Sequence, residues 1–436
     1  MNQAPTHQLN DKRVVSGWTF FDWANSAFAL VITVAIFPIY FIGITDDYIS
    51  IFNYEVSNSA LYAFMLSLSY LIMAAFSPLL SGIADYGKKK KFFMKGFTIL
   101  GGLACLSLFF FTGMENLLLG SIGFMLGLIG FGGGYVFYNS YLPEIVTEDR
   151  YDVVSARGFA MGFIGSVILL LLCLAVIQNP GTFGFAADSS IPVRLSFVFV
   201  GLWWLGFSII PFRRLPKDQG GVPLKALRKK GAEELRKVWR SLKHQRNTKK
   251  FLISFFCYSA GVQTVLYLAS TFAEKELKFA TSELILIILI LQIVAIIGAY
   301  VFAGVSKLKG NKFSLMTMLL IWVGICVYGY FIESQFQFYI VASSVGVVMG
   351  GTQSLSRSTY SKIIPEGTVD TTSYFSFYDV LEKTATVFGT FSFAAIEQIT
   401  GDMRTGVLLM ALFFILGLII LVGVQIKHAK NGVITH

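Results

Sequence analysis

Charged side chains are scarce in this chain. They make up 14% of its 436 residues, whereas a soluble globular domain carries about 25%. So few charges cannot cover a water-facing surface, and 55% of the residues are apolar with a mean hydropathy of +0.67. The composition therefore argues against an ordinary soluble protein and predicts one whose surface faces lipid.

Motifs for nucleotide-driven or covalent chemistry are also missing. The sequence has no Gly-x-x-x-x-Gly-Lys-Ser/Thr phosphate-binding loop and no nucleophile–base arrangement, so we expect neither ATP hydrolysis by this chain nor an enzyme. The first apolar run is too long for a cleavable signal peptide, and we expect none. The cysteines lie inside apolar runs without metal-ligand spacing, so we expect no disulfide framework, metal or other cofactor. These cysteines are Cys105, Cys173, Cys257 and Cys326.

Apolar segments long enough to cross a bilayer are abundant. A spanning helix needs about 20 mostly apolar residues, and the sequence holds twelve such segments. They cover residues 20–44, 59–81, 92–113, 117–141, 157–177, 194–212, 250–272, 283–305, 313–332, 337–358, 373–396 and 404–426. The tenth and eleventh are the weakest, because they contain polar and charged residues. The sequence thus predicts an all-α membrane protein with twelve transmembrane helices.

Basic residues are distributed unevenly between the two sides of the predicted membrane. The formal net charge is +10, and nearly all Lys and Arg residues fall on the side that holds both termini. The exceptions are Arg194, Lys275, Lys278 and Arg404 on the other side, and Lys383 within a span. Cytoplasmic loops carry the positive excess, so we expect cytoplasmic termini. Anionic headgroups of the inner leaflet, rather than nucleic acid, are the expected partners of these charges.

A basic linker divides the chain into two halves. We predict a six-helix bundle over residues 1–212, a cytoplasmic linker over 213–249 and a second six-helix bundle over 250–436. The halves show a faint repeat, because Gly82 and Gly304 are separated by the same number of residues as Pro143 and Pro365. A repeat after six helices is parallel, as in the halves of major facilitator transporters.

The linker itself contains an amphipathic helical pattern. Its apolar residues share one face, and Arg and Lys fill the rest. The apolar positions are Leu224, Leu227, Leu235, Val238 and Leu242. Two interpretations remain open: a helix lying on the inner leaflet, or a solvated linker helix.

Three sequence blocks resemble a known family. They are Asp22-Trp23-Ala24-Asn25-Ser26-Ala27-Phe28, Gly261-Val262-Gln263-Thr264, and Gly350-Gly351-Thr352-Gln353-Ser354-Leu355-Ser356-Arg357-Ser358. These blocks resemble the vacuole-effluxer-like family of the major facilitator superfamily, which includes fungal autophagy-related vacuolar amino-acid exporters and bacterial permeases. The resemblance covers nearly the whole chain. It implies a major facilitator fold and transport of amino acids or related metabolites, moved outward and coupled to protons.

The loop after the second span is similar to the cytoplasmic motif of that superfamily. Asp85 and the basic residues that follow it, among them Lys89 and Lys90, match the pattern, whereas Ser81, Tyr86 and Lys88 depart from it. The resemblance implies a latch that holds the end of the second helix against its neighbours. A plain determinant of topology, made of lysines, is the other interpretation. In the seventh span, Ala260 stands where many relatives have Asp.

Polar residues inside the spans identify the candidate substrate site. A charge at the centre of a membrane helix costs about 2.5–3.5 kcal/mol on insertion scales, so such residues face water or partners. The candidates lie on helices that surround the central cavity in major facilitator transporters. They are Asp22, Asn25 and Ser26 in the first span, Gln263 in the seventh, Gln353 in the tenth, and Asp379 and Lys383 in the eleventh. Interhelical hydrogen bonding is the alternative for all of them.

Four ionisable residues carry specific hypotheses. Asp22 is either a proton carrier or a gate anchor paired with a basic residue. Arg357 is expected to be paired rather than to bind substrate, and Glu144, at a helix end, is expected to be solvated or to act as a latch group. Lys383 either forms an ion pair with Asp379 one turn earlier or attracts the carboxylate of a substrate.

The most consistent function is alternating-access transport of small solutes by a monomer in the bacterial inner membrane. Export of amphipathic compounds such as drugs or lysolipids is a second hypothesis. A membrane scaffold or sensor that has lost transport is a third. A shared, water-filled cavity would favour transport, whereas a closed polar seam would favour a scaffold.

Overall fold

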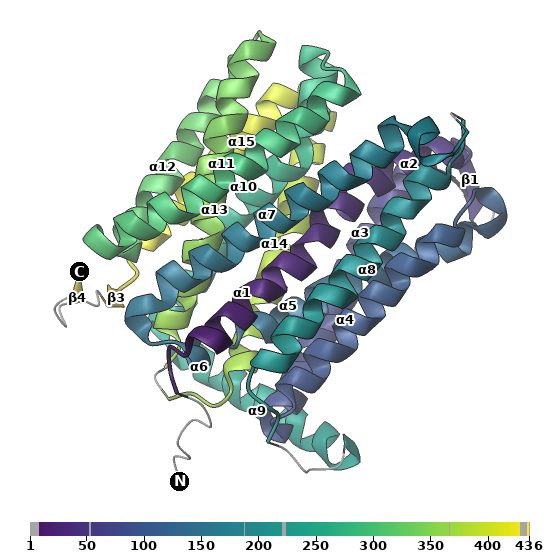
Figure 1. Cartoon of the computed structure of the whole chain (residues 1–436). Coiled ribbons are helices and arrows are strands. Elements are labelled where there is room, and N and C mark those ends of the chain that lie inside the picture. Colours follow the sequence, from purple (N-terminus) through teal and green to yellow (C-terminus); the bar gives the residue numbers. More distant parts are fainter. Residues whose placement is uncertain are drawn as a thin grey trace.

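The computed structural model describes residues 8–51, 54–186, 188–219, 224–365, 367–427 and 434–435. Two bundles of long helices lie side by side (Figure 1). The first contains α1 (Lys12–Phe28), η1 (Ala29–Ile36), α2 (Phe37–Ile44), α3 (Asn58–Gly87), α4 (Lys90–Ser107), α5 (Leu117–Asn139), α6 (Leu142–Ile145), α7 (Tyr151–Gln178) and α8 (Ile191–Arg214). The second contains α10 (Arg246–Leu277), α11 (Thr281–Lys309), α12 (Asn311–Tyr330), α13 (Gln335–Ile363), α14 (Thr371–Thr400) and α15 (Met403–Val422).

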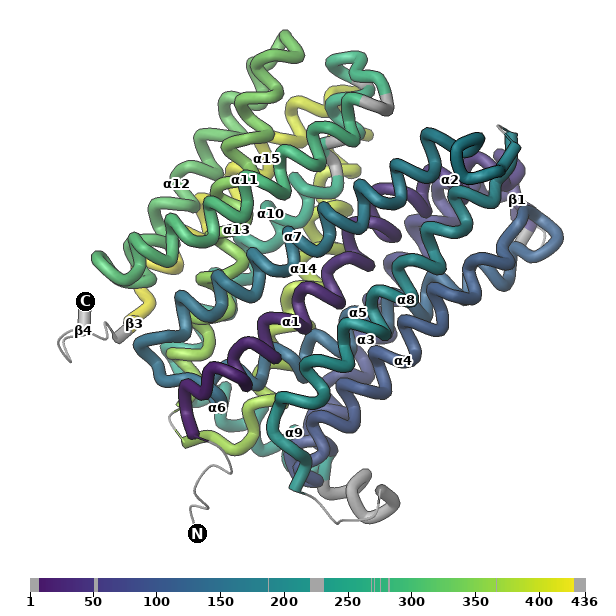
Figure 2. The backbone as a smooth tube through the Cα atoms, viewed as in Figure 1, coloured from purple at the N-terminus to yellow at the C-terminus, as the bar shows by residue number. Residues whose placement is uncertain are grey.

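Short elements complete the chain. The hairpin β1 (Tyr48–Ile51) and β2 (Tyr54–Ser57) is antiparallel, as is β3 (Ile426–Lys427) with β4 (Ile434–Thr435). One-turn 3₁₀ helices join several long helices: η2 (Leu108–Phe110), η3 (Met114–Asn116), η4 (Glu148–Arg150) and η5 (Pro180–Phe183). We call the end of the bundles where α9 (Leu224–His244) lies the linker end, and the end with β1 the far end (Figures 1 and 2).

The first spanning helix is longer than predicted and contains a π-helical segment. It begins at Lys12 because the Asp11 side chain caps it, accepting hydrogen bonds from the backbone N–H groups of Arg13 (2.7 Å) and Val14. The π-helical η1 continues α1 into α2 without a break. Such segments are rare and often mark functional sites, and η1 lies at the level of the central cavity described below.

Hydropathy alone does not identify every long helix as a membrane span. Within the described residues, ten helical stretches are long and apolar enough to cross a membrane. The helices α10 and α14, which are the seventh and eleventh predicted spans, are not among them. We attribute this to their polar residues, several of which face the space between the bundles.

Glycine permits very close helix packing at the centre of the first bundle. A Cβ atom on Gly130 of α5 would lie 2.5 Å from the Cα atom of Gly101 in α4. No side chain fits at that distance, so the two backbones pack directly against each other. The two bundles contact each other mainly through α7 with α11 and α13, and through α3 with α14.

The linker helix α9 docks on protein. A Cβ atom on Gly82 of α3 would lie 2.3 Å from the carbonyl oxygen of Gly231 in α9. Val238 and Leu242 of α9 are only 1% and 6% exposed. The residues at these two apolar positions are therefore covered by the bundles, neither by lipid nor by water, which differs from both interpretations of the sequence. The side chains at 224–230 lie outside the described part.

Candidate functional site

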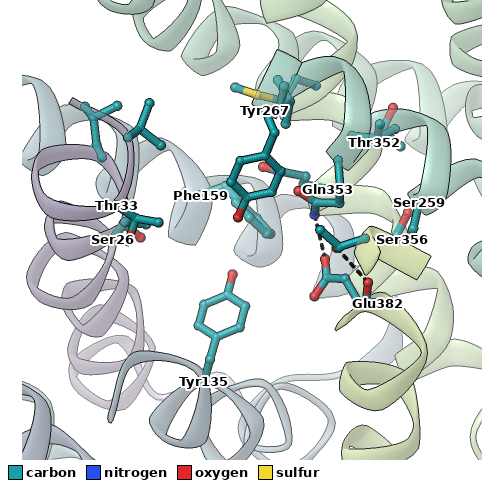
Figure 3. A pocket seen from close by; sticks show the side chains of 18 of the residues that line it. Ser26, Thr33, Tyr135, Phe159, Ser259, Tyr267, Thr352, Gln353, Ser356 and Glu382 are labelled. Carbon is teal, nitrogen blue, oxygen red and sulfur yellow. Dashed lines mark hydrogen bonds between the residues drawn. The ribbon is translucent and has the colours of Figure 1, made fainter. Parts of the chain in front are cut away.

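A cavity of about 270 Å³ lies between the two bundles. Side chains from both bundles line it, and Figure 3 shows them pointing toward a common space. Its polar and charged lining includes Ser26, Thr33, Tyr70, Tyr135, Asn139, Ser166, Tyr258, Ser259, Gln263, Tyr267, Gln292, Thr352, Gln353, Ser356, Arg357, Tyr378, Glu382, Lys383 and Thr386. The polar faces of several helices thus converge on one site.

The first-bundle wall is shaped by the π-helical segment. Thr33 lies in η1, and its carbonyl oxygen accepts a hydrogen bond from the Tyr62 hydroxyl of α3 (2.7 Å). Ser26 lies just before this segment and lines the same cavity. Tyr135 and Asn139 of α5 extend this wall toward the linker end. The wall therefore offers hydroxyl and amide groups, without a charge of its own.

The second-bundle wall contains an ionic cluster on α14. The Lys383 Nζ atom lies 2.9 Å from Oδ1 of Asp379 and 3.7 Å from Oε2 of Glu382. The contact with Asp379 follows from helix geometry, since residues four apart lie on one face, whereas Glu382 is the chain neighbour of Lys383. The Gln263 side chain of α10 donates a hydrogen bond to Glu382 (3.3 Å). The cluster combines two carboxylates with one ammonium group.

Arg357 forms the floor of the cavity on the linker side and joins the bundles. Its Nη1 atom lies 3.4 Å from Asp22 Oδ2, and both side chains are 1% exposed. The guanidinium also donates to the Asn139 side chain (3.2 Å) and to the hydroxyl and carbonyl oxygens of Ser155 (2.9 and 2.8 Å). The Tyr138 hydroxyl donates to the same Asp22 oxygen. Such a buried pair persists only with this many compensating hydrogen bonds.

A second set of contacts closes the linker end between α3 and α14. The Asp85 carboxylate accepts hydrogen bonds from the backbone N–H groups of Thr372 (3.2 Å) and Ser373 (2.7 Å), the first residues of α14. A carboxylate is favourable there, because the N-terminus of a helix presents unpaired N–H groups and partial positive charge. Lys90 contacts both Glu144 and the Thr371 hydroxyl. The Lys90–Glu144 pair lies within the first bundle, whereas the Lys90–Thr371 contact and the Asp85 hydrogen bonds join the first bundle to the second.

A third set joins α7 to the second bundle. Asp152 accepts hydrogen bonds from Ser306 (2.9 Å), Asn311 (2.7 Å) and Lys362 (2.7 Å). The sequence analysis did not select Asp152. In the sequence, Asp152 is recognisable only as an acidic residue in the first turn of a helix. Acidic residues are common at that position, because they stabilise the helix through its dipole.

On the far side, a hydroxyl pair crosses the cavity. The hydroxyl groups of Tyr70 (α3) and Tyr267 (α10) lie 2.8 Å apart. The Lys383 ammonium group lies 5.7 Å from the centre of the Tyr70 ring. One hydrogen bond of this kind contributes only about 1 kcal/mol, so this contact between the bundles is weak compared with those at the linker end.

The predicted site residues occupy three places. Ser26, Gln263, Gln353, Lys383 and Arg357 line the cavity. Asp22, Asn25 and Asp379 are buried and do not line it; Asp22 contacts Arg357, and Asp379 contacts Lys383. Asp85, Lys90 and Glu144 lie at the linker end, where Lys89 stands at the N-cap position of α4.

Sequence reasoning missed Glu382 and the tyrosines of the cavity. Glu382 is an ionisable residue inside a predicted span, which is by itself reason to suspect a functional role. Asp379, Lys383 and Thr386 are spaced by four and three residues and so share one helix face, and Glu382 stands outside this spacing. Tyr70, Tyr135 and Tyr378 carry no such signal, since tyrosine is also common at membrane interfaces.

Comparison with known proteins places the chain in a family. The family model described as vacuole effluxer Atg22 like matches residues 10–433. The chain belongs to this Atg22-like family. It is 30% identical to the MFS-type transporter YxiO of Bacillus subtilis (strain 168) over 414 residues, 93% of each chain. It is also 25% identical to autophagy-related protein 22 of Kluyveromyces lactis, covering 86% of this chain and 81% of that protein.

The fold of the Atg22-like chain is that of the major facilitator superfamily. The human organic anion transporter MFSD10 (TETRAN) superposes with a TM-score of 0.71 at 12% identity, covering 95% of this chain and 100% of that one. The resemblance and the twelve-helix fold predicted from the sequence are therefore confirmed, and the chain is a multi-pass membrane transporter of the MFS type. Among its described residues, no group of three or more His, Cys, Asp or Glu side chains could hold a metal ion.

Proposed function

We propose that this Atg22-like chain is a secondary active transporter that moves a small zwitterionic solute by alternating access. The observation that carries this proposal is the single cavity shared by both bundles, with a carboxylate and an ammonium group side by side in its wall. In an alternating-access transporter, two bundles rock about a central site that faces one side at a time. A shared site between two separable bundles fits that mechanism.

The structure corresponds to a state closed on the linker side. Charged contacts between the bundles concentrate there: Arg357 with Asp22, Lys362 with Asp152, and Asp85 with the start of α14. On the far side, the Tyr70–Tyr267 pair is an uncharged contact between the bundles. We infer from the basic residues of the linker that the linker end faces the cytoplasm. A state closed at that end then corresponds to the outward-facing half of the transport cycle.

The cavity chemistry suits an amino acid or a related metabolite. Lys383 would attract a carboxylate and Glu382 an ammonium group, while Gln263 and Gln353 offer amide donors and acceptors. A volume of about 270 Å³ accommodates a small metabolite. Outward movement is supported by the description of the family as vacuole effluxers. Coupling to protons, which the family resemblance implies, completes the proposal.

Two other functions are less well supported. An exporter of amphipathic compounds would fit the aromatic side chains of the wall, but it does not explain a charged cluster in the middle of that wall. A scaffold or sensor could keep its polar residues in a closed seam. Here they surround a cavity instead.

The decisive experiment is transport by purified protein in liposomes. Vesicles loaded with labelled amino acids should release them, driven by an ion or solute gradient and without ATP. A strict ATP requirement would contradict the proposal.

Lys383→Gln should lower the affinity for an anionic or zwitterionic solute by 10-fold or more, which corresponds to about 1.4 kcal/mol. If the double change with Asp379→Asn restores transport fully, then Lys383 only neutralises Asp379 and does not bind substrate.

A further inference from the structure

The ionic cluster on α14 contains one more carboxylate than ammonium groups. Asp379 and Glu382 are two carboxylates that share the single ammonium group of Lys383. Asp379 is 1% exposed, and its Oδ2 atom has no hydrogen-bond partner among the described residues. An uncompensated charge in the interior of a membrane protein is expensive, so such groups neutralise or acquire a partner. The cluster therefore calls for one additional positive charge.

Among the side chains that the structure describes, those of the neighbouring elements do not supply that charge. The groups within electrostatic reach of Glu382 from other helices are the hydroxyls of Tyr70 on α3, Tyr135 on α5, and Tyr258 and Tyr267 on α10. Tyr378, on α14 itself, is another. All of these are neutral below pH ~10. Arg357 lines the same cavity, but it is engaged by Asp22.

The geometry distinguishes the two carboxylates. Asp379 forms the short contact with Lys383 at 2.9 Å and does not line the cavity. Glu382 lies farther from Lys383, at 3.7 Å, and its side chain lines the cavity (Figure 3). Lys383 is therefore the partner of Asp379, and Glu382 is the carboxylate left with the excess charge and with access to water.

A metal cation does not suit this position. Its two polar neighbours, the Gln263 amide NH₂ and the Lys383 ammonium group, are hydrogen-bond donors. Hard cations such as Na⁺ and Ca²⁺ need several oxygen ligands instead. A proton needs only the Glu382 oxygen itself.

We propose that Glu382 carries the proton that is exchanged for the solute. This inference rests on the proposed function, which it deepens. A proton from the outer water forms an O–H bond with a Glu382 carboxylate oxygen while the cavity faces outward. After the bundles reorient, that O–H bond breaks, the proton passes to cytoplasmic water, and the ammonium group of the solute takes its place beside the carboxylate. One proton enters for each solute that leaves, and no other bond changes.

The proton on Glu382 can be detected without knowing the solute. Dicyclohexylcarbodiimide reacts with protonated carboxyl groups in apolar surroundings, and peptide mass spectrometry locates the adduct. We expect an adduct on Glu382 of the intact purified protein at pH 6, with labelling that falls as the pH is raised to 9. Glu333, which is exposed, serves as the internal control and should stay unlabelled. Absence of a Glu382 adduct at every pH would overturn the proposal.

A charge-balance variant tests the cause. In Asp379→Asn only one carboxylate remains for Lys383, so Glu382 should form the ion pair and give up its proton. Labelling of Glu382 at pH 6 should then fall by about 10-fold, the ratio expected for one pKa unit. Unchanged labelling would overturn the charge-balance argument. Glu333→Gln is the matched control and should leave the labelling of Glu382 as in the wild type.

A transport measurement tests the role of Glu382 independently of the labelling. In liposomes, Glu382→Gln should lose the part of labelled amino-acid release that a pH gradient drives. Release by Glu382→Gln that still responds fully to the pH gradient would overturn the assignment of the proton to Glu382. If the wild type releases none of the labelled amino acids, the proposed function fails, whereas the labelling result still decides whether Glu382 holds a proton.

Discussion

Asp22 and Arg357 form a buried ion pair that joins the two bundles. An aspartate inside an apolar helix must be paired or neutralised, so the need for a partner was predictable. The identity of the partner was not, because Arg357 stands 335 positions away and in the other bundle. The two groups meet because α7 packs against both α1 and α13. Of the two hypotheses for Asp22, the contacts favour the gate anchor.

We expect the Asp22–Arg357 pair to be essential for stability. Arg357→Gln should leave Asp22 buried without a positive partner, and removal of one member of such a pair costs about 3–5 kcal/mol. The thermal unfolding midpoint in detergent should therefore fall strongly. Arg150→Gln, a change at an exposed arginine, should leave it unchanged. Adding Asp22→Asn to Arg357→Gln should recover part of the loss; a double variant less stable than Arg357→Gln would contradict this account.

At the scale of elements, hydropathy identifies most of the spanning helices and fails for two helices that carry polar residues of the candidate site. The helices α10 and α14 fall short of an ordinary membrane span, and they carry Gln263, Asp379, Glu382 and Lys383. The same polar residues that lower the apolar signal build the cavity. The docking of α9 was not predictable, because an apolar helical face does not reveal whether lipid or protein covers it. The glycines at 82 and 231 become informative only when the two helices are seen in contact.

The close approach at Gly231 should control the docking of α9. A Cβ atom there would lie 2.8 Å from the backbone nitrogen of Ile83, so Gly231→Val should push α9 away from α3. We expect backbone amides in residues 231–244 to exchange with deuterium at least 10-fold faster, a loss of about 1.4 kcal/mol. Gly206→Val is the control, since nothing lies within 4 Å of a Cβ atom at that position. Equal exchange in both variants would rule out tight docking at Gly231.

The docking of α9 should also depend on pH. Burial, and secondarily a hydrogen bond with Glu234, raises the pKa of Asp370 above its usual value of about 3.9. The docked state therefore holds this proton more tightly than an undocked one, so docking is strongest at low pH and weakens as the pH rises through the raised pKa. A spin label at Arg240→Cys should be more mobile above that pKa than below it. Asp370→Asn should remove the dependence, and a label that becomes more mobile on acidification would have the wrong sign.

For the whole molecule, the twelve-helix membrane fold could be predicted from the sequence. It depends on local composition, because each spanning helix is an apolar segment of its own. The shape of the cavity did not follow, because it depends on how two bundles that are far apart in the chain face each other. Glu382 and the Tyr70–Tyr267 contact become visible only once both walls are placed.

Orientation in the membrane is the remaining whole-molecule prediction, and the structure sharpens its test. Lys90 is a poor reporter, because it is 8% exposed and a thiol there would resist reagents from either side. Lys88 and Lys309 at the linker end are exposed, as are Asp46 and Glu115 at the far end. In a variant without native cysteines, an impermeant maleimide should label Asp46→Cys and Glu115→Cys on intact cells. Lys88→Cys and Lys309→Cys should react only after permeabilisation, and their labelling on intact cells would reverse the orientation.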